Sequence, residues 1–416
     1  MTTLLRVCTA GSVDDGKSTL IGRLLFDAKV LMSDQLSQVE EASRRRGFAR
    51  TELALVTDGL RAEREQGITI DVAWRYFSVP GRRFILADTP GHLQYTRNMV
   101  TGASTAEAAL LLVDARAGLT EQSRRHLYLS TLLGVRHLVV AINKMDQVEF
   151  SYPRFDELRQ TIAAYLRDHT NGTESVAYVP VSALHGDNVV TRSGRTPFYD
   201  GPTLLEYLTT LDVATEEASA PFRMAVQWIV RPQSETHHDY RGIAGRIAAG
   251  TIRVGDRVTL FPSGTSTVVR ELEWSGQRVS EASAGASVTL QLADDVDVSR
   301  GDLVAAPEAA VQKSVDLEGD LAWFSPREAQ VGKRYLLKHT TRTVKATLHG
   351  ITHVVDIGSG APLPQKTVRE NDIARVTIKT ASPLYWEPYQ RQRTLGSALL
   401  VDETTHETVG GLMLRG

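Results

Sequence analysis

One short segment combines residue types and spacing that suit phosphate chemistry. Residues 11–18 read G-S-V-D-D-G-K-S and fit the pattern G-x-x-x-x-G-K-S/T. Glycines let successive backbone N–H groups approach anionic oxygens, while the lysine and the hydroxyl can reach the β- and γ-phosphates and Mg²⁺. The segment therefore predicts a loop that binds a nucleoside triphosphate. The candidate contact residues are Gly11, Ser12, Val13, Asp14, Asp15, Gly16, Lys17, Ser18 and Thr19.

The flanking residues predict a strand before this loop and a helix after it. Residues 4–8 form an apolar run, and Leu20, Ile21, Leu24 and Leu25 recur at helical spacing. The positive end of a helix that begins near Gly16 would point at the same anion. Strand, loop and helix occur in the order that a phosphate site needs.

A second segment belongs at the γ-phosphate. The apolar run 84–87 predicts a buried strand that ends in D-T-P-G-H at residues 88–92. Ligands of open α/β sheets bind at the carboxyl ends of strands. We expect Asp88 to position the metal through water and the Gly91 N–H to contact the γ-phosphate.

Two further segments select the base. The run 139–142 ends in N-K-M-D at residues 143–146. Guanine presents two adjacent donors, which the Asp146 carboxylate can accept, whereas adenine would leave this carboxylate unpaired. We expect Asn143 to hold the purine from its other edge and the Lys144 stem to cover the base. Ser182, Ala183 and Leu184 follow another apolar run and would close the pocket with backbone N–H groups.

A threonine between the phosphate loop and Asp88 is the candidate first switch. It lies in R-E-Q-G-I-T-I-D at residues 64–71. Thr69 can coordinate Mg²⁺ and sense the γ-phosphate. The predicted metal ligands are therefore Ser18, Thr69 and Asp88.

These motifs resemble those of the translation-factor class of GTPases, which are built like elongation factor Tu. The wording of several segments is most similar to the GTPase subunit of bacterial sulfate adenylyltransferase. The matching ranges are 11–25, 57–71, 94–106, 112–116, 180–184 with 186–190, and 199–205. The resemblance runs from residue 4 to the C-terminus and is strongest before residue 210. Leu93 departs from it, because members of that family usually carry Glu at this position.

The resemblance implies a fold and a mechanism. The expected fold is an α/β P-loop GTPase domain followed by two all-β barrel domains, with GTP and Mg²⁺ bound in the first. His92 would orient the attacking water and act with Lys17 and Thr69 in catalysis. Val13 and Ile68 would form an apolar gate beside His92, and Asp14 would help hold a monovalent cation.

The resemblance also implies a partner. Hydrolysis of GTP would drive the synthesis of adenosine 5′-phosphosulfate and pyrophosphate from ATP and sulfate in sulfate assimilation. Adenylyl transfer would occur in a separate small catalytic subunit, in a heterodimer or higher assembly. Because the sequence ends at Gly416, we expect no fused adenosine-phosphosulfate kinase.

The pattern of predicted elements divides the chain into three domains. Strands and helices alternate to about residue 212, and short alternating strands follow a polar linker. The expected domains are 1–214, 219–310 and 312–416. The expected barrel strands are 222–230, 242–248, 257–261, 266–273 and 287–292 in the first barrel, and 319–324, 335–339, 341–351, 372–380 and 397–402 in the second.

Composition is consistent with a soluble cytoplasmic protein. The 416 residues carry a net charge of −2, which provides no global attraction for nucleic acid or anionic membrane. Cys8 is the single cysteine, and no apolar run reaches the ~18 to 20 residues of a membrane span. We therefore expect no disulfide, no membrane and no nucleic acid partner. Two alternatives stay open: a translational GTPase that delivers aminoacyl-tRNA, and a GTPase scaffold without a catalytic partner.

Overall fold

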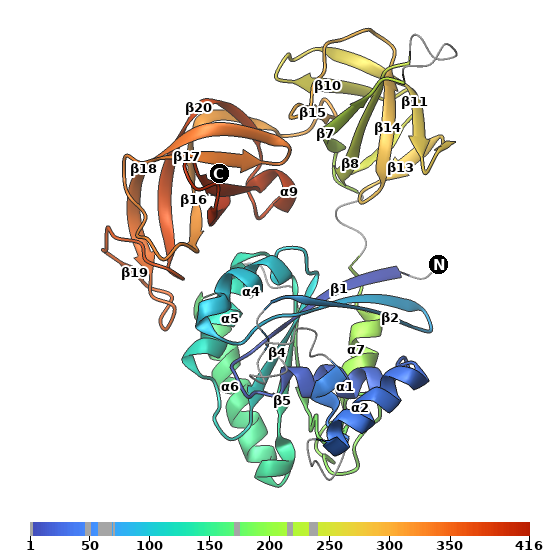
Figure 1. Ribbon diagram of the computed structural model, residues 1–416, viewed down its shortest axis with the longest axis vertical. Coiled ribbons are helices and arrows are strands. Elements are labelled where there is room, and N and C mark those ends of the chain that lie inside the picture. Colours follow the sequence, from blue (N-terminus) through green and yellow to red (C-terminus); the bar gives the residue numbers. More distant parts are fainter. Residues whose placement is uncertain are drawn as a thin grey trace. The chain divides into compact units, whose positions relative to one another are not determined.

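The computed structural model describes residues 3–45, 51–56, 69, 71–169, 175–213, 219–232 and 240–416. It divides into two compact units, Met1–Val213 with Asp356–Ala361, and Ala214–Val355 with Pro362–Gly416. The first unit holds a mostly parallel sheet with helices, and the second holds two barrels (Figure 1). This confirms the predicted fold class. The finer boundaries at 214, 219, 310 and 312 stay predictions.

The sheet of the first unit has the strand order β2-β3-β1-β4-β5-β6, and only β2 runs antiparallel to its neighbour. Every residue of β4 and β5 is buried, which explains their continuous apolar sequences. The strands are β1 (Thr3–Ala10), β2 (Ala73–Val79), β3 (Arg82–Asp88), β4 (Ala108–Asp114), β5 (His137–Asn143) and β6 (Ser175–Pro180).

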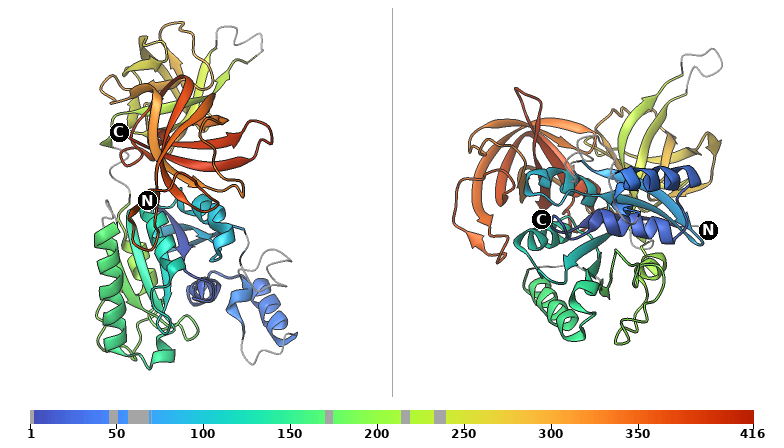
Figure 2. Two further views of the ribbon diagram at one scale, coloured as in Figure 1. Left: turned by 90° about the vertical axis from the view of Figure 1, so that its left-hand side faces the viewer. Right: turned by 60° about the horizontal axis from the view of Figure 1, so that its bottom comes forward.

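Helices cover both faces of this sheet (Figures 1 and 2). On one face lie α1 (Lys17–Asp27) and α7 (Leu204–Thr210), which share a buried cluster with the sheet. On the other lie α4 (Thr96–Ala103), α5 (Glu121–Leu132) and α6 (Tyr152–His169). The unit also contains α2 (Ser33–Arg45) and the short 3-10 helices η1 (Leu53–Val56), η2 (Leu93–Tyr95) and η3 (Met145–Val148). Among the described residues, no helix is long and apolar enough to cross a membrane.

Parallel pairing brings the four predicted motifs to one edge of the sheet. Gly11 follows β1, Asp88 ends β3, Asn143 ends β5 and Ser182 follows β6. Because the carboxyl ends of parallel strands meet at the same edge, motifs as far apart in the sequence as Gly11 and Ser182 can form one site.

In the second unit, β7 to β15 form the first barrel. Pairing of β10 with β11 closes the strand order β10-β15-β7-β8-β14-β11. The strands are β7 (Arg223–Val230), β8 (Gly242–Ala249), β10 (Arg257–Phe261), β11 (Ser266–Trp274), β14 (Ser287–Leu292) and β15 (Leu303–Ala305). Three short strands extend it: β9 (Thr251–Arg253), β12 (Gln277–Arg278) and β13 (Glu281–Ser283). The five strands predicted here are confirmed, whereas the three-residue β15 was not predicted.

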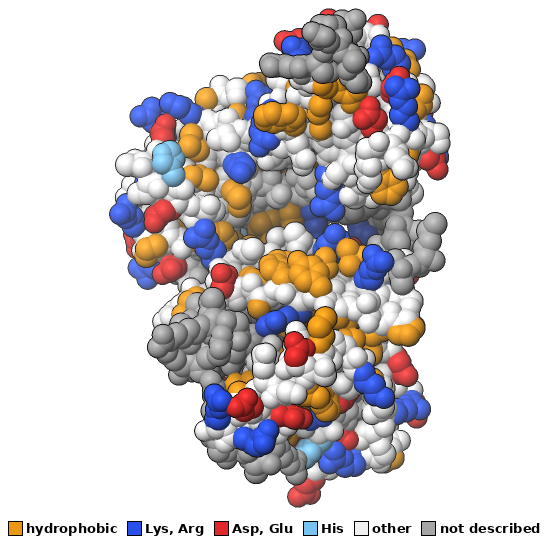
Figure 3. Space-filling view, turned by 45° about the vertical axis from the view of Figure 1, so that its right-hand side comes forward, with side chains coloured by type: hydrophobic (Ala, Val, Ile, Leu, Met, Phe, Trp, Pro, Cys, Tyr) orange, Lys and Arg blue, Asp and Glu red, His pale blue; other side chains and the backbone are white. Residues whose placement is uncertain are grey.

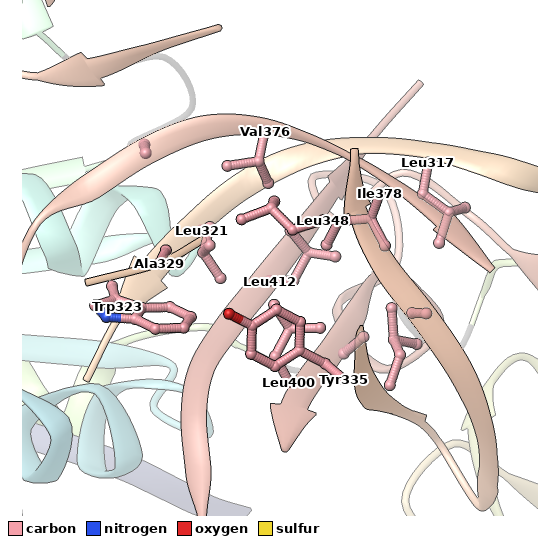
Figure 4. Packing of buried hydrophobic residues seen from close by; sticks show 14 of the residues in the cluster. Leu317, Leu321, Trp323, Ala329, Tyr335, Leu348, Val376, Ile378, Leu400 and Leu412 are labelled. Atoms are coloured by element: carbon pink, nitrogen blue, oxygen red, sulfur yellow. The ribbon is translucent and has the colours of Figure 1, made fainter. Parts of the chain in front are cut away.

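The second barrel closes through β17 and β18 in the order β17-β21-β22-β16-β20-β18. Its strands are β16 (Gln312–Trp323), β17 (Arg334–His339), β18 (Arg342–Val355), β20 (Ile373–Trp386), β21 (Ser397–Asp402) and β22 (Thr408–Arg415). The strand β19 (Pro362–Leu363) pairs with β18, and α9 (Arg393–Gly396) precedes β21. In the core of this barrel, Trp323 packs edge-on against Tyr335 among Leu321, Leu400 and Leu412 (Figure 4).

The strand β22 was not predicted, because Gly410 and Gly411 interrupt its apolar pattern. Glycine weakens a strand unless another backbone approaches closely. Here a Cβ on Gly410 would lie 3.0 Å from the carbonyl oxygen of Ala322. On the paired strand, a Cβ on Gly319 would lie 2.6 Å from that of Met413. Close packing between β16 and β22 explains Gly410 and Gly319, whereas a Cβ on Gly411 would make only ordinary contact with the Phe324 ring.

A buried ion pair joins the two barrels within the second unit. The Arg223 side chain is 2% exposed and that of Glu387 is 0% exposed. Arg223 Nη2 donates to Glu387 Oε2 at 2.9 Å, and Nε donates to Oε1.

On the surface, charges of both signs are interspersed over the face shown in Figure 3, as the small net charge suggests.

We predict that Arg223→Met destabilises the barrel unit by about 3 to 5 kcal/mol, because it leaves a buried carboxylate without its main partner. Urea unfolding followed by tryptophan fluorescence measures this effect, since Trp228, Trp274, Trp323 and Trp386 all lie in the barrels. The matched double variant Arg223→Met with Glu387→Leu should recover most of the loss. An equal loss in the double variant would contradict the ion pair as the cause.

Candidate nucleotide-binding site

The phosphate loop needs glycine at both of its fixed positions. Gly11 has φ +139° and Gly16 has φ +93°, conformations that other residues rarely adopt. A Cβ on Gly16 would lie 2.6 Å from Asn143 Nδ2, and one on Gly11 would lie 2.7 Å from the carbonyl oxygen of Leu112. The loop therefore lies directly against the ends of β4 and β5.

The loop lysine is buried beneath the loop backbone. Lys17 is 7% exposed, and its Nζ donates to the carbonyl oxygens of Gly11 at 3.0 Å and Ser12 at 2.7 Å. Burial lowers the pKa of Lys17, and burial raises the pKa of Asp15 to about 6. Asp15 Oδ2 accepts from the Ser12 N–H at 2.6 Å. These carbonyl groups hold the Lys17 Nζ in place within the loop, and its contact with a phosphate stays a prediction.

Helix α5 holds the start of the phosphate loop. This support was not predicted from the sequence. The Gly11 N–H donates to Nδ1 of the fully buried His126 at 2.8 Å. Ser12 Oγ lies 2.8 Å from Oγ1 of Thr120, the N-cap of α5. The Gln122 amide lies 3.0 Å from His126 Nε2. Burial lowers the pKa of His126 to about 3, so that Nδ1 stays free to accept.

Asn143 joins the phosphate loop to the predicted base-binding loop. Its Nδ2 donates to the carbonyl oxygen of Asp15 at 2.8 Å, and its Oδ1 accepts from the Ala183 N–H at 2.9 Å. A second hydrogen on Nδ2 leaves a donor for the base. Asn143 is 2% exposed, and its contact with a purine stays a prediction.

The carboxylate predicted to read guanine is oriented by the neighbouring loop. Ser182 Oγ donates to Asp146 Oδ1 at 2.7 Å, and Gln147 Nε2 donates to Oδ2 at 3.0 Å. Burial by itself would raise the pKa of Asp146, but these two hydrogen bonds hold it below its ordinary value. The group is therefore an acceptor at neutral pH, which is what guanine requires.

Two more side chains hold the loops that are predicted to bind the base, residues 143–147 and 182–187. Lys144 Nζ pairs with Asp114 Oδ2 at 2.9 Å and donates to the carbonyl oxygen of Asp14, and the contact of its stem with a base stays a prediction. From α1, Arg23 donates to the carbonyl oxygens of Ala183 at 3.2 Å and Leu184 at 2.7 Å. The Leu184 side chain is 48% exposed. The roles of Asp114 and Arg23 were not predicted.

The predicted metal ligands suit Mg²⁺, which takes oxygen ligands and keeps several waters. Ser18 is half-buried in the first turn of α1, where Thr19 is half-buried as well. Asp88 is 1% exposed, and its Oδ1 accepts from the Thr9 hydroxyl at 3.1 Å. Thr69 is half-buried. These are few ligands for a complete protein cage, and among the described residues no cluster of three or more His, Cys, Asp or Glu groups forms one.

The switch residues are described in part. Gly91 is buried, and a Cβ on it would lie 2.5 Å from Lys17 Nζ, which places its backbone beside the loop lysine. His92 is half-buried, with its ring edge-on to Tyr95 at 6.1 Å between centroids. Val13 is 38% exposed. Its expected gate partner, Ile68, lies outside the described residues, as do residues 57–67 and the side chain of Leu93.

We predict that His126 makes stability depend on pH below its ordinary pKa of 6.5. The folded state keeps the imidazole neutral down to about pH 3, whereas the unfolded chain takes up a proton below pH 6.5, so stability falls as pH falls through this window. Between pH 7 and pH 5 the loss is about 2 kcal/mol. Urea unfolding of the wild type and His126→Asn measures it. Parallel pH profiles for the two proteins would contradict the assignment.

We predict that Asp146→Asn shifts nucleotide preference from GTP towards xanthosine triphosphate, because the new amide can donate to the xanthine 2-oxo group. The expected change in relative affinity is at least about 100-fold, since an unpaired polar group in the pocket is costly. Competition binding with the two triphosphates measures it. Unchanged GTP affinity would count against the role of Asp146.

Comparison with known proteins identifies the family of this chain. The family model of the elongation factor Tu GTP binding domain matches residues 2–215, and that of the GTP-eEF1A C-terminal domain matches residues 316–414. The bifunctional enzyme CysN/CysC of Mycobacterium tuberculosis is 47% identical over 100% of this chain and 68% of its own length.

Two shorter relatives match over most of both chains. Sulfate adenylyltransferase subunit 1 of Teredinibacter turnerae is 45% identical over 99% of this chain and 87% of its own length. The protein of the same name from Bacteroides fragilis is 45% identical over 97% and 84%. The chain therefore belongs to the elongation factor Tu-type GTPases and, within them, to the family of sulfate adenylyltransferase subunit 1.

Proposed function

We propose that this protein is the GTP-hydrolysing subunit of a sulfate adenylyltransferase. It would couple GTP hydrolysis to the synthesis of adenosine 5′-phosphosulfate and pyrophosphate from ATP and sulfate. The observation that carries the proposal is identity of about 45% along nearly the whole chain to relatives with this name. The hydrogen bonds that orient Asp146 and Asn143, the residues predicted to bind guanine, are consistent with it.

Each step of GTP hydrolysis has a candidate residue at the edge of the sheet. Lys17 would contact the β- and γ-phosphates, and the Gly91 N–H would report the γ-phosphate to the second switch. His92 would orient the attacking water. Bound Mg²⁺, held by Ser18, Thr69 and water on Asp88, would offset the charge that develops on the phosphates. Because Lys17 is already ordered, little reorganisation is needed when GTP binds.

We further propose that adenylyl transfer occurs in a separate small catalytic subunit. The sequence contains no S-G-G-x-D-S pyrophosphate loop that would mark a second nucleotide site. The name "subunit 1" of the relatives supports a partner. Coupling then requires that the partner bind the GTP and GDP forms with different affinities, because a ligand shifts an equilibrium only through differential affinity.

The alternative of aminoacyl-tRNA delivery has weaker support. The GTP-binding motifs are common to both classes, but identity to the sulfate adenylyltransferase relatives extends through both barrels. In addition, the described part of the face shown in Figure 3 carries interspersed charges of both signs and no continuous basic surface. A tRNA-binding assay with this protein separates the two functions.

We predict that co-purification with the small subunit yields GTP-stimulated formation of adenosine 5′-phosphosulfate. His92→Ala should bind GTP with nearly wild-type affinity but hydrolyse it about 100-fold more slowly, so that the stimulation disappears. Product formation and phosphate release, each measured with and without GTP, test this. Binding of aminoacyl-tRNA together with failure to bind the small subunit would overturn the proposed function.

A further inference from the structure

The turn that carries Asp146 ends in two residues with unusual backbone conformations. After η3, Glu149 has φ 54° and Phe150 has φ 52°, and the Phe150 N–H donates to the carbonyl oxygen of Met145 at 2.8 Å. Left-handed backbone at two consecutive non-glycine residues is unfavourable and persists only where surrounding contacts support it. One such contact is with Arg195, whose guanidinium carbon lies 4.6 Å from the centre of the Phe150 ring.

The same arginine also holds the loop that carries Ser182. Arg195 Nε donates to Asp187 Oδ1 at 3.0 Å, and Nη2 donates to Oδ2. The Asp187 side chain is 8% exposed, and its backbone pairs with Ser182, whose N–H donates to the Asp187 carbonyl oxygen at 3.3 Å. Ser193 Oγ donates to Asp187 Oδ1 at 2.6 Å. A shift of Asp187 would therefore move Ser182.

These contacts form a second connection between the two base-binding loops. The first is the hydrogen bond from Ser182 to Asp146, at the site predicted for the base. The second runs from Phe150 through Arg195 to Asp187, farther along both loops. Arg195 is 48% exposed and comes from a segment that no nucleotide motif includes. It can influence the base only through the loops that it joins.

We propose that Arg195 is a positioning residue that sets guanine specificity by holding the Asp146 turn against the Ser182 loop. This inference rests on the proposed role of Asp146 in reading guanine. The planar guanidinium suits both contacts at once, because it can stack on a ring while its edge binds a carboxylate through two parallel hydrogen bonds. A lysine would keep the charge but lose the paired geometry.

The effect should appear in base discrimination and not in the chemical step. Inosine triphosphate keeps the N1–H of GTP but lacks the 2-amino group, so that the affinity ratio of the two nucleotides reports how well the Asp146 carboxylate is placed. In Arg195→Gln, we expect the Kd for GTP to rise about three- to tenfold and the preference for GTP over inosine triphosphate to shrink. KM for GTP should rise with kcat unchanged.

The matched control is Arg192→Gln, which removes the same charge from the same loop. Arg192 donates to the carbonyl oxygen of Gly201 at 3.2 Å and is exposed. We expect it to leave both affinities unchanged. Phe150→Leu removes the ring that Arg195 covers and should reproduce the loss of discrimination. If the residues act through one connection, the double variant should lose no more than the stronger single variant.

Binding of fluorescent GTP and competition by inosine triphosphate, with circular dichroism to confirm folding, supply the measurements on the full chain. An unchanged affinity ratio in folded Arg195→Gln or Phe150→Leu would overturn the inference while leaving the proposed function intact. Additive losses in the double variant would also overturn it. Absence of GTP preference in the wild type would refute the guanine assignment itself.

Discussion

The site depends on the two hydrogen bonds made by the Asn143 side chain. One reaches the carbonyl oxygen of Asp15 in the phosphate loop, and the other accepts the N–H of Ala183. Because the loops predicted to bind the triphosphate and the base are separate, this single amide fixes the distance between them. The contact requires Gly16, because any side chain there would collide with Asn143.

Around the Asn143 side chain, few of the buried charged groups that the structure describes lack a partner. Lys17 is buried against carbonyl oxygens and faces the Asp15 carboxylate, while the neutral ring of His126 supplies an acceptor without adding a second positive charge. A protonated histidine would lose the hydrogen bond to Gly11 and repel Lys17. Burial of His126 thus preserves both the shape and the electrostatics of the loop.

The barrels follow a different principle. Each barrel is a closed sheet around an apolar interior. The contact between the two barrels includes one buried arginine and one buried glutamate. Such a pair contributes orientation more reliably than stability, since removing one member is costly while replacing both need not be.

The sequence by itself identified the candidate residues for phosphate, metal and base binding, because spacing within each motif is local and each motif follows a recognisable strand. It also indicated the three-domain fold and ten of the barrel strands. Whether each motif residue performs its expected role stays a prediction. Residues 57–68, which include most of the first switch segment, lie outside the described structure.

The tertiary structure alone decided which residues hold the motifs in place. His126 lies 115 residues from Gly11, and Arg23 lies 160 residues from Ala183. No local pattern marks such pairs, because their meaning arises only when parallel strands bring distant loops to one edge. The same is true of β22, where Gly410 interrupts the apolar pattern of the sequence and proves to lie where the backbone of β16 approaches closely. Spacing along the chain can indicate which residues are candidates for the chemistry. Only proximity in space shows which other residues hold them in place.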